Sequence, residues 1–129
     1  MRGPLQTKQP KRSRSSIRVL VVDDFSPVAN AILNILSSNF YEARAAYTAA
    51  DALEIAEQFM PHVLISDVIL PDMDGFNLAA KFAQRHPGCR VLLMSVGLER
   101  VLENDAGLRV VRKVSALEEL FRLLEDCRG

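Results

Sequence analysis

Short, nearly continuous apolar runs alternate along the chain with segments in which apolar residues recur every three or four positions. The first pattern is typical of strands buried on both faces, and the second of helices that bury one face. Expected strands cover Ile17–Val22, Tyr41–Tyr47, His62–Asp67, Arg90–Ser95 and Leu108–Lys113. Expected helices cover 26–39, 48–60, 74–85, a short segment at 98–104, and a last segment from 115. This alternation predicts an α/β protein with a parallel sheet and helices on both of its faces.

Residues suited to helix caps mark most of the helix starts. The candidate N-caps are Ser26, Thr48, Asp74 and Ser115, with Pro27 at a first helical position. Asp72 is expected to serve the turn before Asp74. The side chains expected to face inward from the helices are Val28, Ile32, Ile35, Leu36, Ala52, Leu53, Ile55, Ala56, Phe59, Phe76, Ala79, Ala80 and Ala83, and the Met and Phe positions in general are expected in the core.

Carboxylates follow two of the expected strands at the point where each strand ends. Asp23 and Asp24 follow Val22, and Asp67 ends the strand that begins at His62. The carboxyl ends of parallel strands share one edge of a sheet, so these three side chains are expected to converge. Two such charges about 6 Å apart repel by roughly 2 to 3 kcal/mol at an effective dielectric constant near 20. A divalent cation would reverse that cost, and hard carboxylate oxygens suit Mg2+.

Two stretches carry a family resemblance, from Leu20 to Ser26 (LVVDDFS) and from Ser66 to Gly75 (SDVILPDMDG). They resemble the two acidic signatures of bacterial response-regulator receiver domains, and the resemblance extends over about 17–127. It implies a flavodoxin-like, doubly wound fold with five parallel strands in the order 2-1-3-4-5. In that order the strands that end at Asp23 and Asp67 are neighbours.

The resemblance also implies roles for individual residues. Asp67 would be the phosphoacceptor, and Ser95 and Lys113 would hold the phosphoryl oxygens. Asp24 and Asp67 would bind Mg2+ directly, Asp23 would act mainly through water, and the backbone carbonyl of Ile69 would complete the protein's share of the ligands. The phosphoryl donor would be a sensor histidine kinase or a phosphotransfer protein, and the signal would pass to an unknown downstream protein by contact.

The C-terminal third departs from the family pattern. Lys113 is not followed by the usual proline, and Arg112 could take its place if the last connection is one residue longer. The interval from Ser95 to Lys113 is shorter than is usual in the family. Val110 stands where many receivers carry an aromatic switch residue, and Val96 replaces a small residue. The acidic pocket is therefore expected to be intact and the switch to be altered.

Composition and charge fit one soluble domain with a basic leader. The chain has 129 residues, of which 49% are hydrophobic and 25% charged, and no apolar run is long enough to span a bilayer. The first 18 residues carry six basic and no acidic side chains, so the remainder has ten basic and sixteen acidic ones. Residues 1–16 are expected to be disordered, either as a solvated tail or as an arm for nucleic acid or an acidic partner. Cys89 and Cys127 are expected to be reduced, although a bridge between them is left open.

Three functions are weighed from the sequence. The leading hypothesis is a cytoplasmic, single-domain response regulator of a two-component phosphorelay, with no enzymatic activity of its own, no membrane anchor and no DNA-binding output domain. The second is a receiver-like docking module that works independently of phosphate. The third is a phosphohydrolase, which usually needs a second acid two residues after its nucleophile. Because Ile69 stands at that position, the sequence disfavours the third hypothesis.

Overall fold

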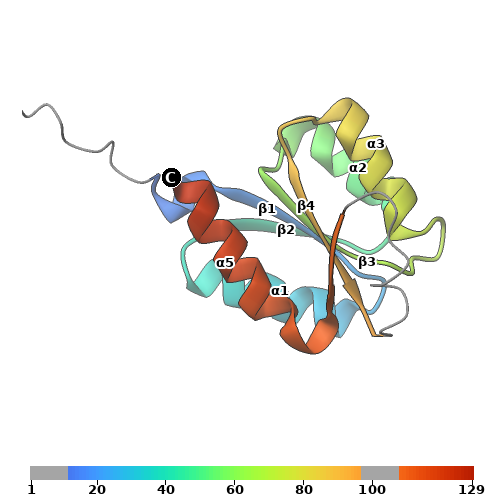
Figure 1. Cartoon of the computed structure of the whole chain (residues 1–129), viewed down its shortest axis with the longest axis horizontal. Helices are drawn as coiled ribbons and strands as arrows, with labels where there is room; N and C mark the ends of the chain where they lie inside the picture. The colour runs from blue at the N-terminus through green and yellow to red at the C-terminus, as the bar shows by residue number, and fades with distance from the viewer. Residues whose placement is uncertain (1–11, 97–107) are drawn as a thin grey trace, which may run out of the picture.

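A computed structural model describes residues 12–96 and 108–129 of the chain (Figure 1). The strands are β1 (Arg18–Val22), β2 (Glu42–Ala46), β3 (Val63–Asp67), β4 (Arg90–Ser95) and β5 (Arg109–Arg112). The α-helices are α1 (Ser26–Ser38), α2 (Ala49–Phe59), α3 (Gly75–Arg85) and α5 (Ala116–Arg128), and two 3-10 turns are η2 (Arg14–Ser16) and η3 (Lys113–Ser115). The short helix expected at 98–104 lies outside the described residues. No helix in the described part of the chain has the length and apolar character needed to cross a membrane.

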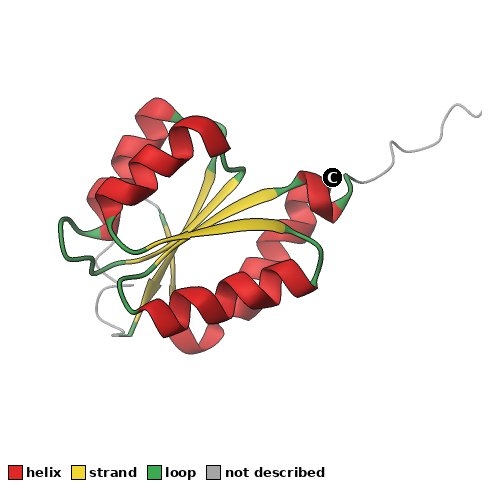
Figure 2. Ribbon diagram, turned by 180° about the vertical axis from the view of Figure 1, so that it is seen from behind, coloured by secondary structure: helices red, strands yellow, loops and turns green. Residues whose placement is uncertain are grey.

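The strands form one parallel sheet in the order β2-β1-β3-β4-β5. Helices α1 and α5 cover one face of this sheet, and α2 and α3 cover the other (Figures 1 and 2). The predicted doubly wound, flavodoxin-like fold and its strand order are therefore confirmed. The weakly apolar β2 lies at one edge, where Glu42 and Arg44 are exposed, as its polar residues indicated.

Strand β1 shows why its sequence is continuously apolar. Val19 and Val21 pack into the core beneath α1 and α5, whereas Leu20 and Val22 pack into the core beneath α2. Successive side chains of a strand point to opposite faces of the sheet. With both faces covered, every position in the run must be apolar.

The expected N-caps are only partly confirmed. Thr48 caps α2 by accepting a hydrogen bond from the Asp51 N–H (3.0 Å), and Asp74 caps α3 by accepting one from the Asn77 N–H (2.8 Å). Ser26 is not a cap, because α1 already includes it and the cap position belongs to Phe25. Ser115 occupies the cap position of α5 but makes no side-chain capping bond.

Several residues expected in the core lie on the surface. In α3 the buried apolar residues include Leu78 and Phe82, whereas Ala80 and Ala83 are exposed. The larger apolar side chains thus decide which face of the helix turns inward, since alanine is tolerated on either side. Three further large side chains are more than half exposed, and these are Phe25, Phe40 and Met60.

The exposure of Phe40 and Met60 follows from their backbone conformation. Phe40 has φ 73° and Met60 has φ 48°, so both adopt left-handed geometry just after a helix. At the end of α1 the Phe40 N–H bonds to the Ser37 carbonyl (3.0 Å), and the Tyr41 N–H bonds to the Leu36 carbonyl (3.0 Å). This hydrogen-bond pattern ends a helix and turns the chain sharply. The turn buries Tyr41, which is 3% exposed, and leaves Phe40 outside.

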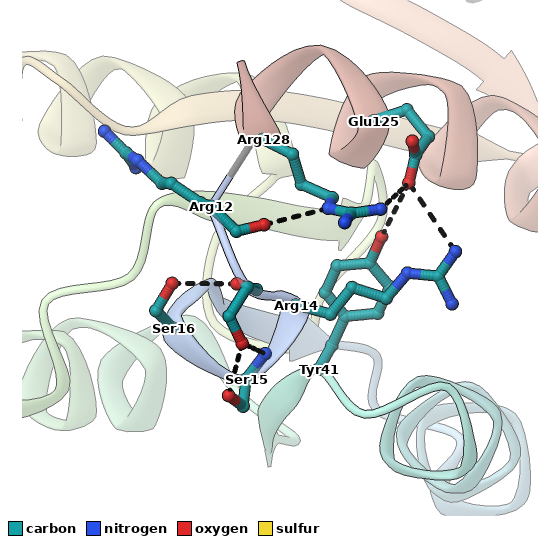
Figure 3. A network of polar contacts seen from close by, with 8 residues as sticks. Arg12, Arg14, Ser15, Ser16, Tyr41, Glu125 and Arg128 are labelled. Carbon is teal, nitrogen blue, oxygen red and sulfur yellow. Dashed lines mark hydrogen bonds and ion pairs between the residues drawn. The ribbon is translucent and has the colours of Figure 1, made fainter. Parts of the chain in front are cut away.

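The expectation of a disordered leader over residues 1–16 is wrong for its last residues. Residues 14–16 form η2, and Ser13 caps this turn by accepting a hydrogen bond from the Ser15 N–H (3.2 Å). The segment packs beside the end of α5 (Figure 3). The rest of the leader, residues 1–11, lies outside the described residues.

Backbone and charged groups hold η2 against α5. The Arg12 N–H donates to the Arg128 carbonyl (2.8 Å), and the Arg128 guanidinium donates to the Arg12 carbonyl (3.0 Å). Glu125 accepts hydrogen bonds from Arg128 (2.9 Å) and Tyr41 (3.4 Å), and Arg14 lies 3.8 Å from the same carboxylate (Figure 3). Cations at a helix C-terminus oppose its partial negative charge. These contacts give the end of the basic leader a structural role.

The two cysteines are free, as expected. Burial raises the pKa of the Cys89 thiol to about 12, and burial also raises the pKa of Cys127. Both thiols therefore stay protonated at neutral pH, which keeps their nucleophilic reactivity low.

Candidate functional site

The predicted acidic site forms at the carboxyl edge of the sheet. Strands β1 and β3 are paired with Val22 opposite Ser66, so the residues that follow, Asp23 and Asp67, lie side by side. One carboxylate oxygen from each of Asp23, Asp24 and Asp67 lies within 4.8 Å of the others. Asp23 is fully buried, Asp67 is 9% exposed, and Asp24 is exposed. The three carboxylates that the sequence placed at strand ends therefore converge, and such a group of oxygens could hold a metal ion.

Lys113 brings a positive charge into this acidic site. Its ammonium nitrogen lies 2.9 Å from an Asp23 oxygen and 3.1 Å from an Asp67 oxygen. Lys113 was expected to end a strand, but β5 stops at Arg112 and Lys113 begins η3 instead. The Arg112 side chain is exposed. Of the two cations that the sequence left open, Lys113 is the one that reaches the carboxylates.

The site remains negatively charged despite the lysine. Burial raises the pKa of Asp67, the Lys113 contact lowers it, Asp23 raises it, and the net direction is upward. For Lys113, burial lowers the pKa, but its bonds to Asp23 and Asp67 outweigh this effect and raise it, so the ammonium stays protonated. Three carboxylates and one ammonium group leave two net negative charges when all are ionised. A divalent cation would balance that charge.

The remaining predicted site residues lie at the same edge. Ser95 ends β4 and is 3% exposed, and the pairing of Asp67 with Met94 places Ser95 one position beyond Asp67 on the adjacent strand. The Ile69 backbone lowers the pKa of the Asp67 carboxylate, while the Ile69 side chain is 62% exposed. The Ile69 backbone, rather than its side chain, thus contacts the acidic group.

The two valines that replace usual receiver residues have different surroundings. Val96 is 79% exposed just after β4. Val110 is 8% exposed and belongs to a small core cluster with Val68 and Leu93. A small buried aliphatic residue thus occupies the position where many receivers carry an aromatic switch residue.

Gly75 allows the loop after Asp67 to pack closely against β3. The Gly75 N–H donates to the Val68 carbonyl at 2.6 Å. A Cβ atom at position 75 would lie 2.6 Å from the Asp67 carbonyl oxygen and 3.0 Å from the Val68 Cα. Real Cβ atoms essentially never approach backbone atoms as closely as 2.6 Å, so only glycine fits here without a shift of the chain. From the sequence, Gly75 was expected only to supply turn chemistry.

Asp72 has a contact that the sequence did not reveal. Its two carboxylate oxygens accept hydrogen bonds from the N–H groups of Ala49 (2.9 Å) and Ala50 (2.8 Å) in the first turn of α2. These bonds lower the pKa of Asp72. Local turn chemistry had been expected for this residue, but its partners lie 23 and 22 positions away in the sequence. No pattern around Asp72 could have identified them.

Comparison with known proteins agrees with this fold and site. The sequence model of the response regulator receiver domain matches residues 19–100, which is more than half of the chain. The chain therefore belongs to the response regulator receiver domain family. The match ends before β5, so it includes Asp23, Asp24, Asp67 and Ser95 but not Lys113.

Curated relatives include the response regulator MprA of Mycobacterium ulcerans (strain Agy99), which is 33% identical over 110 residues. MprA of Mycobacterium tuberculosis (strain H37Rv) is 32% identical over 110 residues. These alignments cover 82% of this chain but 47% and 48% of the relatives. The chain thus spans about half the length of the curated relatives that it matches.

Solved structures with the same fold include a CheY-like response regulator receiver domain from Methanospirillum hungatei JF-1. It has a TM-score of 0.73 and 27% identity, and the alignment covers 86% of this chain and 95% of that one. The chemotaxis response regulator CheY4 of Vibrio cholerae has a TM-score of 0.70 and 26% identity, with 83% and 98% covered. The likeness therefore extends over nearly all of each receiver.

Proposed function

We propose that this receiver domain accepts a phosphoryl group on Asp67 with the help of Mg2+ and passes the signal on by protein contact. The donor would be the phosphohistidine of a sensor kinase or of a phosphotransfer protein. The observation that carries the proposal is the pairing of Lys113 with both Asp23 and Asp67, at 2.9 and 3.1 Å, beside the exposed Asp24. A mainly structural acidic pair would not need a third carboxylate open to solvent.

The donor atoms fit Mg2+. This ion prefers oxygen ligands and usually keeps several of its waters. Asp24 and Asp67 would bind it directly, Asp23 would act through water, and the Ile69 carbonyl would add a backbone oxygen. When bound, Mg2+ would neutralise charge that develops on the phosphoryl oxygens during transfer.

The residues of the chain then divide the chemistry among them. A carboxylate oxygen of Asp67 attacks the phosphorus, so a P–O bond forms while the bond from phosphorus to the donor atom breaks and the donor keeps the electron pair. The Lys113 ammonium would bind a phosphoryl oxygen, because it already lies 3.1 Å from an Asp67 oxygen. Ser95 would donate its hydroxyl hydrogen to another phosphoryl oxygen. Since the nucleophile must be ionised, the raised pKa of Asp67 predicts slower uptake as the pH falls through that pKa.

Intact mass spectrometry tests the proposal. The parent protein is incubated with acetyl phosphate and Mg2+, and in parallel with acetyl phosphate and EDTA. A gain of one phosphoryl group with Mg2+ only is the expected result. No gain with a donor that phosphorylates a known receiver in the same buffer would contradict the proposal.

The cation of the site gives a second prediction. Lys113→Ala should slow phosphoryl uptake by about 100-fold, the effect of removing one preorganised donor from a reacting group. Arg112→Ala is the matched control, because Arg112 precedes Lys113 and its side chain is exposed. This variant should take up phosphate at nearly the parent rate. The rates can be followed by intact mass over time. A larger loss in Arg112→Ala would assign the role to Arg112, and an equal loss in the two variants would contradict a specific role for Lys113.

A groove beside the site suits the protein donor. Its volume is about 300 Å3, and apolar side chains of α1 and α5, including Ile35 and Leu117, line it together with Lys113. Because Lys113 contacts both the groove and Asp67, a donor helix seated there would lie next to the phosphoacceptor. Ile35 was expected in the core, but it is 36% exposed and lies at this groove. We propose that the groove receives the helix that carries the phosphohistidine.

Ile35→Glu should therefore slow transfer from a protein donor and leave uptake from acetyl phosphate unchanged. We expect a roughly tenfold loss, because a charge at one apolar contact commonly costs more than about 1 kcal/mol of binding. The donor is a phosphorylated histidine phosphotransfer domain selected for transfer to the parent. Met60→Glu is the control, since Met60 is 56% exposed at the end of α2 on the opposite face of the sheet. A similar loss in both variants, or with acetyl phosphate, would count against docking in this groove.

One observation favours a second function, that of a docking module independent of phosphate. The switch position holds the buried Val110, so an aromatic side chain is not available there to report phosphorylation. This alternative predicts that Asp67→Asn leaves the binding of a downstream partner unchanged. Partner binding that depends on Asp67 phosphorylation would exclude it.

A further inference from the structure

The loop between β3 and α3 is tied to the first turn of α2 through Asp72. One Asp72 oxygen accepts from the Ala49 N–H at 2.9 Å and the other from the Ala50 N–H at 2.8 Å. Thr48 already satisfies the next donor in this turn, the Asp51 N–H, at 3.0 Å. Free N–H groups at a helix start carry partial positive charge and attract a carboxylate. Asp72 is thus a cap supplied to α2 by a different segment of the chain.

The same loop carries backbone groups that lie at the acidic site. The Ile69 backbone is near enough to the Asp67 carboxylate to lower its pKa, and the Ile69 carbonyl is the proposed backbone ligand of the metal. Only two residues, Leu70 and Pro71, separate Ile69 from Asp72. Proline restricts its own φ and the conformation of the residue before it, which limits the slack in this short stretch.

The other parts of the loop are held by the sheet and by α3. The Val68 N–H donates to the Met94 carbonyl of β4 at 2.8 Å, and the Gly75 N–H donates to the Val68 carbonyl at 2.6 Å. A backbone bridge also joins Ile69 and Asp74. These bonds fix where the loop leaves β3 and where it enters α3. In the outer part of the loop, beyond Pro71, the Asp72 side chain bonds to α2 and Met73 packs against the core beneath α2.

We propose that Asp72 is a positioning residue for the metal and phosphoryl site, acting through the backbone of Ile69. It does not touch the reacting atoms. By holding the loop to α2 it would keep the Ile69 carbonyl and N–H in the places where they meet the metal and Asp67. This inference rests on the proposed function, because it assigns the Ile69 carbonyl to Mg2+.

Mg2+ titration by calorimetry tests the role without requiring phosphorylation. Asp72→Ala should weaken Mg2+ binding by about tenfold or more, the usual effect of losing a group that orients a metal ligand. Asp72→Asn has a side chain of the same shape and keeps one oxygen acceptor. Its Mg2+ affinity should lie between those of Asp72→Ala and the parent. Circular dichroism checks that each variant is folded, which is expected because Asp72 is exposed.

Thr48→Ala is the matched control for a merely structural effect. It removes the other side-chain cap of the same helical turn without touching the loop, so it should lower the unfolding temperature while leaving Mg2+ affinity unchanged. If Asp72→Ala lowers only the unfolding temperature, as Thr48→Ala does, Asp72 is a helix cap and the positioning role is wrong. An equal loss of Mg2+ affinity in both variants would also overturn it.

The outcome separates this inference from the proposed function. Mg2+ binding by the parent without phosphoryl uptake would contradict the proposed function but would still allow the Asp72 effect to be measured. Phosphoryl uptake with unchanged Mg2+ affinity in Asp72→Ala would contradict only the positioning role. A parent that binds no Mg2+ would overturn both.

Discussion

Asp67→Asn is expected to abolish phosphoryl uptake from acetyl phosphate while making the metal-free protein more stable to heat. The amide cannot attack phosphorus, so the loss of uptake should be complete rather than partial. The stability gain has a separate cause: the variant removes one of the two buried carboxylates that share Lys113. Intact mass with Mg2+ and thermal unfolding in EDTA, followed by circular dichroism because the chain has no tryptophan, measure the two effects.

The stability difference should depend on pH in a definite direction. Burial raises the pKa of Asp67 above its ordinary value of 3.8, so the fold disfavours the ionised form. The resulting destabilisation is absent below 3.8, grows as the pH rises through the raised pKa, and is complete above it. The gap in unfolding temperature between Asp67→Asn and the parent should therefore be widest near neutral pH and narrow on acidification. Added Mg2+ should stabilise the parent more than the variant, because it binds the carboxylate.

Asp126→Asn is the control for both measurements. Asp126 is an exposed carboxylate near the end of α5. Its replacement should leave the mass gain and the unfolding temperature close to those of the parent. Uptake of one phosphoryl group by Asp67→Asn would place the acceptor elsewhere. A lower unfolding temperature for Asp67→Asn at neutral pH would show that Lys113 more than compensates for the charge of Asp67.

Gly75→Ala is expected to destabilise the fold and to slow phosphoryl uptake together. The new methyl group would lie 2.6 Å from the Asp67 carbonyl oxygen, and backbone atoms cannot move aside as a flexible side chain can. Either α3 or the end of β3 must shift, and overpacking of this kind typically costs about 1 to 3 kcal/mol. Because the clash is with the backbone of the phosphoacceptor itself, the same shift should disturb the site.

Gly88→Ala provides the matched control for Gly75→Ala. A Cβ atom at Gly88 would meet nothing within 4 Å, so this variant should change the free energy of unfolding by no more than about 1 kcal/mol, in the stabilising direction if at all. Urea unfolding monitored by circular dichroism compares the two variants, and the mass assay compares their uptake rates. Equal stability of Gly75→Ala and Gly88→Ala would mean that the chain relaxes around the methyl group at little cost.

Much of the fold was predictable because its signals are local or follow from topology. Alternating apolar runs and amphipathic segments identified every described strand and α-helix, and Thr48 and Asp74 marked the starts of α2 and α3. The periodicity alone did not determine the strand order, which came from the resemblance of the acidic motifs. Once β1 and β3 are neighbours, the parallel arrangement places Asp23 beside Asp67.

Surface exposure was predicted less well, because the apolar character of a residue does not indicate the backbone conformation at its position. Phe40 and Met60 follow helices in left-handed geometry, which turns their side chains away from the core. The end of the leader was mispredicted for a related reason. Its composition favours disorder, but Arg12 contacts Arg128 and Arg14 contacts Glu125. Both partners belong to α5 and lie more than 100 positions away in the sequence.

The sequence by itself determined the class of fold, the acidic residues of the site and the positions of two helix caps, because these depend on residue type and on neighbours along the chain. Only the tertiary structure showed that Lys113 rather than Arg112 reaches Asp23 and Asp67, since this depends on where β5 stops pairing with β4 and the chain turns into η3. It alone revealed that Asp72 binds α2, and that Gly75 lies against the Asp67 carbonyl. Each of these contacts joins segments that the packing of the sheet and helices brings together, and such proximity has no signature in the local sequence.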